Sequence, residues 1–307
     1  MTMLLSFILF VMSFSQETQT APARGIVYFS EDNGRTWENK SRGLPDGIFL
    51  SDIAAAPGLL GLSTKHHGIF LFNFASQAWT PLATVPTVDE IDALYFYSNK
   101  IFAGTKNNGV FVTTDLGHTW SQLNQGLKNQ TIRKFICLGQ KLYAGTNGGL
   151  YVLHEPTRRW LLEFGESGLQ VNGIRELNGD LYAGCNRGIL KKGKGDQDWK
   201  QIMPGRSLHN LGVDHNRIYA LTYSELLVSA DQGVSWKSDQ KGMPPKYTFQ
   251  VIETNNTVLA GQWDGVYVKQ GERGWVLSNQ GLPKDLPVPE LIVSGNTVVA
   301  GSSQWSQ

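Results

Sequence analysis

The chain has 307 residues, of which 27 are Lys or Arg and 26 are Asp or Glu, so its net charge is close to zero. A near-neutral chain lacks the basic field that draws nucleic acid or an anionic lipid surface, and we expect neither as a partner. Charged residues make up only 17% of the chain, aromatic residues make up 11%, and 34 residues are glycine; this composition is typical of many short strands joined by tight turns.

The N-terminal segment, residues 3–14, is an apolar run of signal-peptide length. Small residues precede Gln16, which predicts a signal peptide over residues 1–15, followed by a short linker over residues 16–24. An uncleaved anchor is the alternative, because the leading end of the segment has no Lys or Arg. No later stretch is long and apolar enough to span a bilayer. We therefore expect a secreted, periplasmic or cell-surface protein with no membrane span after signal removal.

Tryptophan recurs once in about forty residues, which is the period of a propeller blade. A second element, most often Ala-Gly followed by Thr, Ser or Cys, recurs in step with it. Each series has seven members, which predicts seven blades. The tryptophans are Trp37, Trp79, Trp120, Trp160, Trp199, Trp236 and Trp275, and the second elements lie at 60–63, 102–105, 143–146, 182–185, 219–222, 259–262 and 299–302.

Within the third unit, apolar and polar residues alternate as half-buried strands require. Turn residues divide this unit into four strands, which we expect over residues 131–138, 141–146, 149–153 and 159–163. Four antiparallel strands make one blade.

The two series are out of phase at the chain ends, because the first tryptophan precedes any Ala-Gly element and the last Ala-Gly element follows the final blade tryptophan. The N-terminus therefore supplies the outer two strands of one blade (25–30 and 36–39), and the C-terminus supplies the inner two (290–293 and 297–302). Pairing them removes open sheet edges. The sequence predicts an all-β fold: a closed seven-bladed β-propeller of four-stranded antiparallel blades, forming a single domain over residues 25–307.

Three units carry a tighter signature, S/T-x-D-x-G-x-T/S-W, at the turn between their third and fourth strands. This signature resembles the Asp-box, or BNR repeat, of sialidases, sortilin-type receptors, xyloglucan-cleaving propellers and photosystem assembly factors of the Ycf48 type. In such a turn Asp can accept backbone hydrogen bonds, Gly supplies a positive φ and Trp anchors the hairpin, so we interpret these residues as structural. The resemblance implies that they lie opposite the functional face. They are Asp32, Gly34 and Trp37, then Asp115, Gly117 and Trp120, then Asp231, Gly233 and Trp236.

The resemblance to sialidases does not extend to their catalytic residues. A sialidase has six blades, an early F/Y-R-I-P motif and three arginines for the substrate carboxylate, whereas this chain has seven units and no R-I-P. Glycoside hydrolysis in general needs two carboxylates across one cleft. The acids in the expected face loops indicate no particular pair, so we expect a non-catalytic protein and keep an Asp-box glycoside hydrolase as the alternative. These acids are Asp46, Glu166, Glu225, Asp264 and Asp285.

We expect no cofactor and no metal. The sequence has no P-loop, zincin or serine-esterase motif. His66 and His67 form an adjacent pair without further ligands, which is typical of a solvated loop. Cys137 and Cys185 are too few for a disulfide framework, and we expect buried free thiols.

The functional face of a propeller is formed by the loops from the second to the third strand and by the connections between blades. Seven of the nine tryptophans serve as blade anchors, and the other two, Trp263 and Trp305, both fall in the first loop set on neighbouring blades. With Tyr223 they predict an aromatic and amide surface suited to sugar rings or a peptide. The alternative is that Trp263 covers the rim and Trp305 belongs to a frayed tail. The ligand-binding candidates are His66, Lys106, Asn107, Asn147, Arg187, Tyr223, Trp263, Asp264 and Trp305.

Together these features favour a secreted, non-catalytic binding or scaffold propeller that holds a glycan or polypeptide on its loop face. We expect a monomer. The alternatives are a sialidase-like exo-glycosidase and an assembly factor of the Ycf48 type.

Overall fold

The computed structural model describes residues 25–84, 86 and 90–303. The predicted signal peptide, the linker and Trp305 lie outside the described residues. In this part of the chain, no helix is long and apolar enough to cross a membrane.

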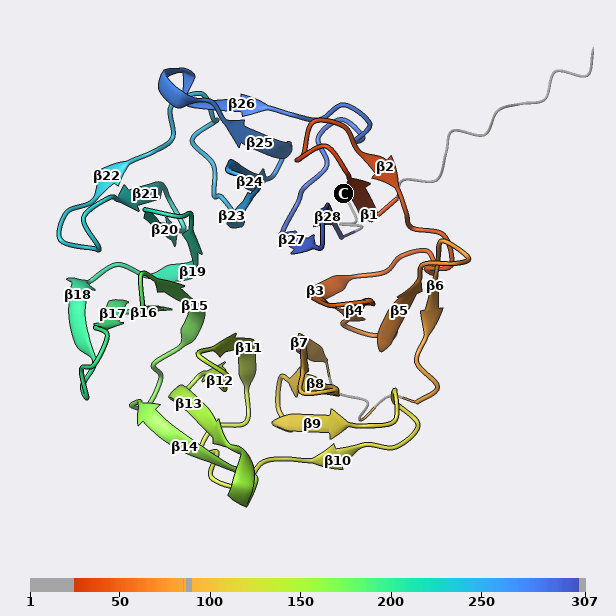
Figure 1. Ribbon diagram of the computed structural model, residues 1–307, viewed down its shortest axis with the longest axis vertical. Coiled ribbons are helices and arrows are strands. Elements are labelled where there is room, and N and C mark those ends of the chain that lie inside the picture. The colour runs from red at the N-terminus through yellow and green to blue at the C-terminus, as the bar shows by residue number, and fades with distance from the viewer. Residues whose placement is uncertain (1–24, 85, 87–89, 304–307) are drawn as a thin grey trace, which may run out of the picture.

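Seven four-stranded antiparallel sheets follow one another around a ring, with the first strand of each sheet nearest the ring axis (Figure 1). This arrangement confirms the predicted seven-bladed propeller. Blade 1 contains β3 (Leu50–Ala56), β4 (Leu59–Thr64), β5 (Ile69–Asn73) and β6 (Ala78–Pro81); blade 2 contains β7 (Ile91–Tyr97), β8 (Lys100–Thr105), β9 (Val110–Thr113) and β10 (Ser121–Gln122); blade 3 contains β11 (Ile132–Leu138), β12 (Lys141–Thr146), β13 (Gly149–His154) and β14 (Arg159–Phe164). Blade 4 contains β15 (Val171–Leu177), β16 (Asp180–Cys185), β17 (Gly188–Lys192) and β18 (Lys200–Pro204); blade 5 contains β19 (Leu208–Val213), β20 (Ile218–Thr222), β21 (Leu226–Ser229) and β22 (Lys237–Ser238); blade 6 contains β23 (Gln250–Thr254), β24 (Thr257–Gln262), β25 (Gly265–Lys269) and β26 (Trp275–Leu277). Blade 7 contains β27 (Glu290–Ser294), β28 (Thr297–Gly301), β1 (Val27–Ser30) and β2 (Glu38–Asn39). Short 3₁₀ turns, η1 (Glu155–Thr157) and η2 (Gly271–Arg273), join the third and fourth strands of blades 3 and 6.

Blade 7 is shared by the two ends of the chain. Strand β1 pairs with β28, with Tyr28 opposite Ala300 and Phe29 opposite Val299. In Figure 1 the red N-terminal strands therefore lie beside the blue C-terminal strands. The predicted closure of the ring is confirmed, although the outermost strand begins only at Glu38, two residues later than expected.

The Ala-Gly elements form the second strands, and their glycines allow adjacent blades to pack closely. A Cβ atom on Gly145 would lie 2.5 Å from the carbonyl oxygen of Val171, which begins blade 4, and one on Gly261 would lie 2.3 Å from that of Val288. Buried apolar clusters then fill the space between neighbouring sheets, as Phe102, Ile132 and Trp160 do between blades 2 and 3. The repeat seen in the sequence therefore follows from blade packing.

Four of the seven blade tryptophans are buried and tie their blade to the preceding one. The indole N–H of Trp79 donates to Lys40 O at 2.7 Å, that of Trp160 to Leu123 O at 2.8 Å, and that of Trp275 to Asp239 O at 2.8 Å; Trp37 does the same toward blade 6. The other three, Trp120, Trp199 and Trp236, are only half-buried. The indole N–H groups of Trp120 and Trp199 still donate toward the preceding blade, to Thr84 O at 3.3 Å and to Glu163 Oε2 at 3.2 Å, whereas that of Trp236 donates to Gly233 O within its own turn. Of the two cysteines, which are both free, Cys185 is buried and Cys137 is only half-buried.

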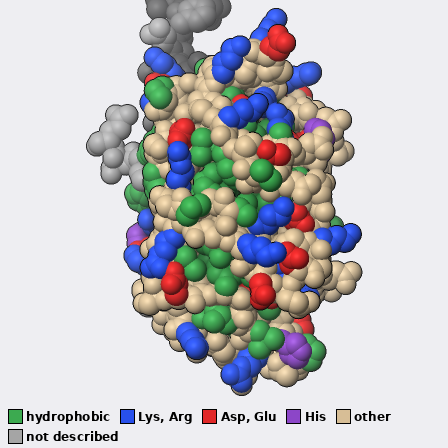
Figure 2. All heavy atoms as spheres, turned by 90° about the vertical axis from the view of Figure 1, so that its left-hand side faces the viewer, with side chains coloured by type: hydrophobic (Ala, Val, Ile, Leu, Met, Phe, Trp, Pro, Cys, Tyr) green, Lys and Arg blue, Asp and Glu red, His purple; other side chains and the backbone are tan. Residues whose placement is uncertain are grey.

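The antiparallel strand order gives the ring two distinct faces. The loops from second to third strand and the connections between blades lie on one face, which we call the loop face. The other turns lie on the opposite face. Among them are the three turns with the S/T-x-D-x-G-x-T/S-W signature; after the motif that this signature resembles, we call them the Asp-box turns and their face the Asp-box face. Figure 2 shows the outer wall between them, where positive and negative side chains are interspersed with apolar ones. This distribution agrees with the near-zero net charge.

Candidate functional site

The three Asp-box aspartates receive hydrogen bonds from their own turns. Asp32 accepts from the backbone N–H groups of Arg35 (3.0 Å) and Thr36 (2.9 Å) and from the hydroxyls of Ser30 and Thr36. Asp115 and Asp231 receive the equivalent bonds from the two hydroxyl residues of their turns. These contacts stabilise the turns on the Asp-box face.

Hydrogen bonding also keeps these aspartates ionised. Burial alone would raise the pKa of Asp32, but the bonds from Thr36, Ser30 and Arg35 lower this pKa to about 2. Hydrogen bonds from Thr113 and Thr119 lower the pKa of Asp115 in the same way, and the pKa of Asp231 is lowered chiefly by Ser235.

On the loop face, the predicted polar candidates are spread over blades 1 to 4. His66 and Asn107 are exposed. Lys106 pairs with Glu90 at 3.2 Å, Asn147 accepts a hydrogen bond from Arg133 at 3.3 Å, and Arg187 forms an ion pair with Glu166. These side chains therefore lie on the predicted face, each with its own local surroundings.

The aromatic candidates are brought together on blades 5 and 6. Tyr223 and Trp263 both lie in loops from second to third strand, and Tyr247 lies between them. The ring centroid of Tyr247 is 5.7 Å from that of Tyr223, with the two rings nearly parallel at 13°, and 6.3 Å from that of Trp263. Phe249 packs against both Tyr247 (4.7 Å) and Trp263 (4.9 Å), and His209 lies 4.1 Å from Tyr247. We call these five side chains the aromatic surface.

His209 belongs to the aromatic surface as a neutral ring. It occupies a β-bulge at the start of β19, between Leu208 and Asn210. Burial lowers the pKa of His209 to about 3, so the imidazole is uncharged at neutral pH. Its Nε2 atom is enclosed and has no hydrogen-bond partner among the side chains and backbone that the structure describes. The aromatic surface therefore carries no charge of its own.

Buried polar groups support the loop that holds Trp263. Gln262 is fully buried, and its Nε2 donates to Thr248 Oγ1 at 2.8 Å. The predicted candidate Asp264 accepts a hydrogen bond from the Tyr267 hydroxyl at 3.0 Å. Asp264 thus lies beside the aromatic surface and helps to hold the loop in place.

Below the loop face, charged side chains from several blades meet at the ring axis. Lys134 Nζ on β11 lies 2.8 Å from Asp52 Oδ1 on β3 and 3.8 Å from Glu290 Oε2 on β27. Gln250 on β23 donates a hydrogen bond to Glu290. We call Asp52, Lys134, Gln250 and Glu290 the axial cluster; it joins blades 1, 3, 6 and 7.

The axial cluster favours a charged lysine and a partly protonated Glu290. Burial would lower the pKa of Lys134, but Asp52 and Glu290 raise it above its usual value. Burial raises the pKa of Glu290 to about 7, against the opposing effect of Lys134. The two shifts are compatible because Lys134 is paired more closely with Asp52, which leaves Glu290 as the second carboxylate around one ammonium group.

Three of the five acids considered for catalysis take part in local contacts. Glu166 forms an ion pair with Arg187, and Glu225 forms one with Arg206. Asp264 accepts a hydrogen bond from the Tyr267 hydroxyl. Asp46 and Asp285 lie on connections between blades. Within the described ranges, no group of three or more His, Cys, Asp or Glu side chains is placed to hold a metal ion.

Sequence reasoning missed three members of the aromatic surface and the whole axial cluster. The three missed rings lie at or just before the start of a first strand. The spacing of tryptophans gives no information about these positions. The three residues are His209, Tyr247 and Phe249. The sequence does contain a signal for the axial cluster, because its members stand at equivalent positions of four first strands: Asp52, Lys134, Gln250 and Glu290. Polar residues repeating at blade spacing inside buried strands indicate side chains that meet at the axis.

The sequence matches no protein-family model and none of the curated proteins. Solved structures do resemble the fold. The extracellular domain of a hybrid two-component system from B. thetaiotaomicron has a TM-score of 0.67 at 16% identity, over 85% of this chain and 39% of that one. Ycf48 bound to a D1 peptide has a TM-score of 0.66 at 16% identity, over 85% of this chain and 96% of that one. Ycf48 from Cyanidioschyzon merolae has a TM-score of 0.65 at 15% identity, over 85% and 95% of the two chains.

These likenesses establish the propeller fold. The chain spans about two fifths of the length of the B. thetaiotaomicron domain, whereas it is similar to nearly all of the Ycf48 chains.

Proposed function

We propose that this chain is a non-catalytic binding propeller that holds a polypeptide segment against the aromatic surface. The observation that carries the proposal is the gathering of five rings from two adjacent blades, with 58% of Tyr223 and 37% of Trp263 exposed. Tyrosine and tryptophan most often dominate the binding energy of protein interfaces. Large exposed apolar rings that lie together mark a surface which a partner covers.

Two considerations favour a polypeptide over a glycan as the ligand. The Ycf48 chain, which is similar over almost its whole length, carries a D1 peptide. The aromatic surface itself is uncharged and formed largely by ring faces and edges, which suit apolar side chains. A glycan, whose sugar rings also stack on tyrosine and tryptophan, is the alternative ligand.

Export and membership of the Asp-box group belong to the same proposal. Solved extracellular domains share the fold, and residues 3–14 have signal-peptide character. The hydrogen bonds of Asp32, Asp115 and Asp231 are those that an Asp-box turn requires. A scaffold of this kind would work outside the cytoplasm, alone or within a larger assembly.

The test is a selection from a peptide display library on the purified protein, run beside a glycan array. We expect selected peptides to be rich in aromatic or long aliphatic residues. Replacing Trp263 or Tyr223 with Ala should weaken their binding by about tenfold or more, which corresponds to the 1–2 kcal/mol of an interface anchor. The matched control is Phe74→Ala, because Phe74 is 47% exposed but lies on the Asp-box face. Unchanged binding in both loop-face variants would show that the aromatic surface is not the binding site. A signal on the glycan array alone would show that the ligand is a glycan and not a polypeptide.

A panel of chromogenic glycosides that includes a sialoside tests the absence of catalysis. We expect no turnover. Turnover that is abolished by Asp264→Asn or Glu225→Gln would show that the chain is a glycosidase and would overturn the non-catalytic part of the proposal.

A further inference from the structure

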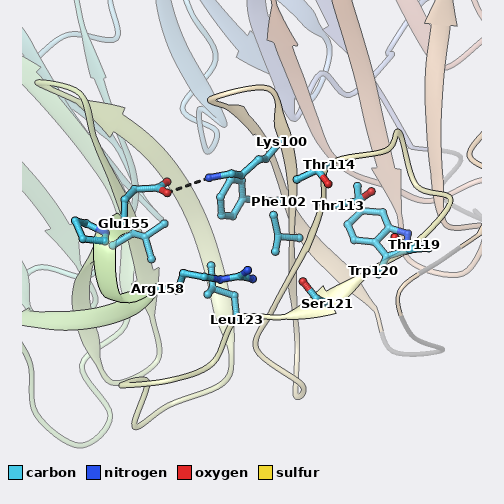
Figure 3. Close-up of a pocket in the computed structure, with 13 residues that line it drawn as sticks. Lys100, Phe102, Thr113, Thr114, Thr119, Trp120, Ser121, Leu123, Glu155 and Arg158 are labelled. Atoms are coloured by element: carbon cyan, nitrogen blue, oxygen red, sulfur yellow. Dashed lines mark hydrogen bonds and ion pairs between the residues drawn. The ribbon is translucent and has the colours of Figure 1, made fainter.

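A hollow lies away from the aromatic surface, in the groove between blades 2 and 3 on the Asp-box face. It encloses about 440 Å³, a volume within the range of small-ligand sites (Figure 3). Four buried apolar side chains that line it form its floor: Phe102, Val112, Leu123 and Leu153. Trp120 lies at one side (Figure 3). Three charged side chains at the rim complete the pocket: Lys100, Glu155 and Arg158.

The equivalent groove between blades 4 and 5 is filled by the protein itself. Lys191 is paired across the sheet with Tyr182, and its ammonium group lies 5.3 Å from the centre of that ring. The lysine forms an ion pair with Asp180 at 2.7 Å, and both Lys191 and the Tyr182 hydroxyl donate to Gln232 O of the next blade. In blade 2 the same cross-strand pair is Phe102 and Val112, which lack both the hydroxyl and the ammonium group.

The groove between blades 5 and 6 is filled in a different way. Lys269, which is paired across the sheet with Trp275, places its ammonium group 4.9 Å from the Trp275 ring and forms an ion pair with Asp239. In blade 3 the residue opposite the equivalent Trp160 is Leu153. The groove between blades 2 and 3 therefore has an apolar residue at each of the two positions where a lysine fills one of these two grooves. A hollow with an apolar floor is left.

The rim of this hollow has a net positive charge. Lys100 Nζ pairs with Glu155 Oε2 at 2.9 Å (dashed in Figure 3). Arg158 ends η1 with a left-handed φ of 50°, and its guanidinium extends toward the middle of the pocket (Figure 3). In the described part of the chain, this guanidinium has no hydrogen-bond or ion-pair partner. Arginine binds carboxylates in a two-pronged geometry, so an unpaired Arg158 above an apolar floor suits an anion with an apolar body.

We propose that this pocket, lined by Phe102, Trp120, Leu153 and Arg158, binds a carboxylate attached to an apolar group. The apolar group lies on Phe102, Val112 and Leu153 beside Trp120, and Arg158 holds the carboxylate. Such a ligand is either a small free organic acid or the C-terminal carboxylate of a polypeptide that ends in an apolar residue. The pocket shares no residue with the aromatic surface, so this proposal stands or falls separately from the proposed function.

The test is a titration of the ¹⁵N-labelled protein followed by NMR, with the indole N–H signal of Trp120 as the reporter. The probes are 3-phenylpropionate, its neutral analogue 3-phenylpropanol, and a short peptide ending in Phe with either a free or an amidated C-terminus. We expect the two carboxylates to shift the Trp120 signal with a Kd of about 1 mM or tighter, and the alcohol and the amide to bind about tenfold more weakly. A stronger response to the peptide than to the acid would identify a polypeptide terminus as the source.

Two variants connect the response to the pocket. Arg158→Met removes the charge from an exposed side chain and should weaken carboxylate binding about tenfold. Ser121→Phe places a ring from exposed strand β10 over the pocket and should abolish binding. Arg35→Met, at the exposed rim of blade 7, is the matched control and should bind as the unaltered protein does. The proposal is wrong if Trp120 does not respond to either carboxylate, if alcohol and acid bind equally, or if Arg158→Met leaves the affinity unchanged.

Discussion

A single carboxylate organises each Asp-box turn by accepting several hydrogen bonds at once. Asp32 takes two from backbone N–H groups and two from the hydroxyls of Ser30 and Thr36. Its function in the turn is that of a helix N-cap residue, which satisfies backbone donors that no strand partner reaches. The aspartates thus explain why the third-to-fourth turns keep their shape where the following strand has only two residues.

Replacing Asp32 with Ala should therefore lower the free energy of unfolding by about 1 kcal/mol, as the loss of a capping side chain does. Urea unfolding at neutral pH measures this loss. Glu31→Ala is the control, because Glu31 is exposed in the same turn.

The stability lost in Asp32→Ala should become smaller as the pH falls. Because the pKa of Asp32 is lowered from 3.8 to about 2, its stabilisation is complete above pH 3.8 and disappears as the pH falls toward 2. An Asp32→Ala variant with an equal deficit at pH 2 and pH 7 would contradict this account.

At this scale the sequence indicated some residues of the aromatic surface and missed others, for a physical reason. Trp263 and Tyr223 were identified because they lie in loops between the second and third strands and are not needed to join blades. Tyr247 and Phe249 were missed because their positions follow from the path of a long connection, which no repeat spacing specifies. Arg158 and Val112 were missed because the pocket exists only where smaller apolar side chains replace the lysines of equivalent blades. This difference is not apparent from one blade alone.

At the scale of strands and blades, the sequence was most informative where packing demands a particular residue at every repeat. The four strands of blade 3 were placed to within a residue at each end, because turn glycines and the Ala-Gly element mark their limits. The fourth strands were less predictable. Several have only two residues and depend on the Asp-box turn and on the neighbouring blade, so alternation of apolar and polar residues cannot develop in them.

The buried tryptophans give this scale a direct test. In Trp79, which is 2% exposed, the indole N–H bonds to Lys40 O of the preceding blade at 2.7 Å. Trp79→Phe keeps an aromatic ring but leaves that carbonyl without its donor, so we expect the free energy of unfolding to fall by about 2 kcal/mol, part from the unmade bond and part from the smaller ring.

Trp236→Phe is the matched control for that loss. Trp236 is only half-buried, and its indole N–H bonds at 3.2 Å to Gly233 O within its own turn. Trp236→Phe should lower the free energy of unfolding by well under half as much as Trp79→Phe does. Thermal or urea unfolding of both variants measures the difference. Equal losses in the two variants would show that burial of Trp79 and its bond to the preceding blade add nothing to the free energy of unfolding.

At the scale of the whole molecule, two independent features close the ring. The shared sheet of blade 7 joins the chain ends through the pairing of β1 with β28. The axial cluster joins blades 1, 3, 6 and 7 through side chains of Asp52, Lys134, Gln250 and Glu290. The first was predictable from the phase of two repeats, whereas the second depends on side chains from four blades that meet only after closure. A closed ring keeps its loops at fixed relative positions, which is what a binding face built from several blades needs.

Glu290 makes the stability of the closed ring depend on pH. Its neighbours in the fold are Lys134 on β11, Asp52 on β3, Arg175 on β15 and Gln250 on β23. Burial raises the pKa of Glu290 from 4.5 to about 7, so between these values the folded protein keeps a proton that the unfolded chain has released. The free energy of unfolding should therefore fall as the pH rises from 4.5 to 7, by on the order of 2 to 3 kcal/mol.

Glu290→Gln keeps the shape of the side chain and its acceptor for Gln250 but removes the titration, and Lys134 keeps its closer partner Asp52. The variant should consequently lose less stability than the unaltered protein between pH 4.5 and 8 in urea unfolding measured at several pH values. Glu38→Gln, on exposed strand β2, should follow the unaltered protein throughout. Parallel pH profiles for Glu290→Gln and the unaltered protein would mean that Glu290 is ionised inside the ring, and that the axial cluster is held by Lys134 bridging two carboxylates.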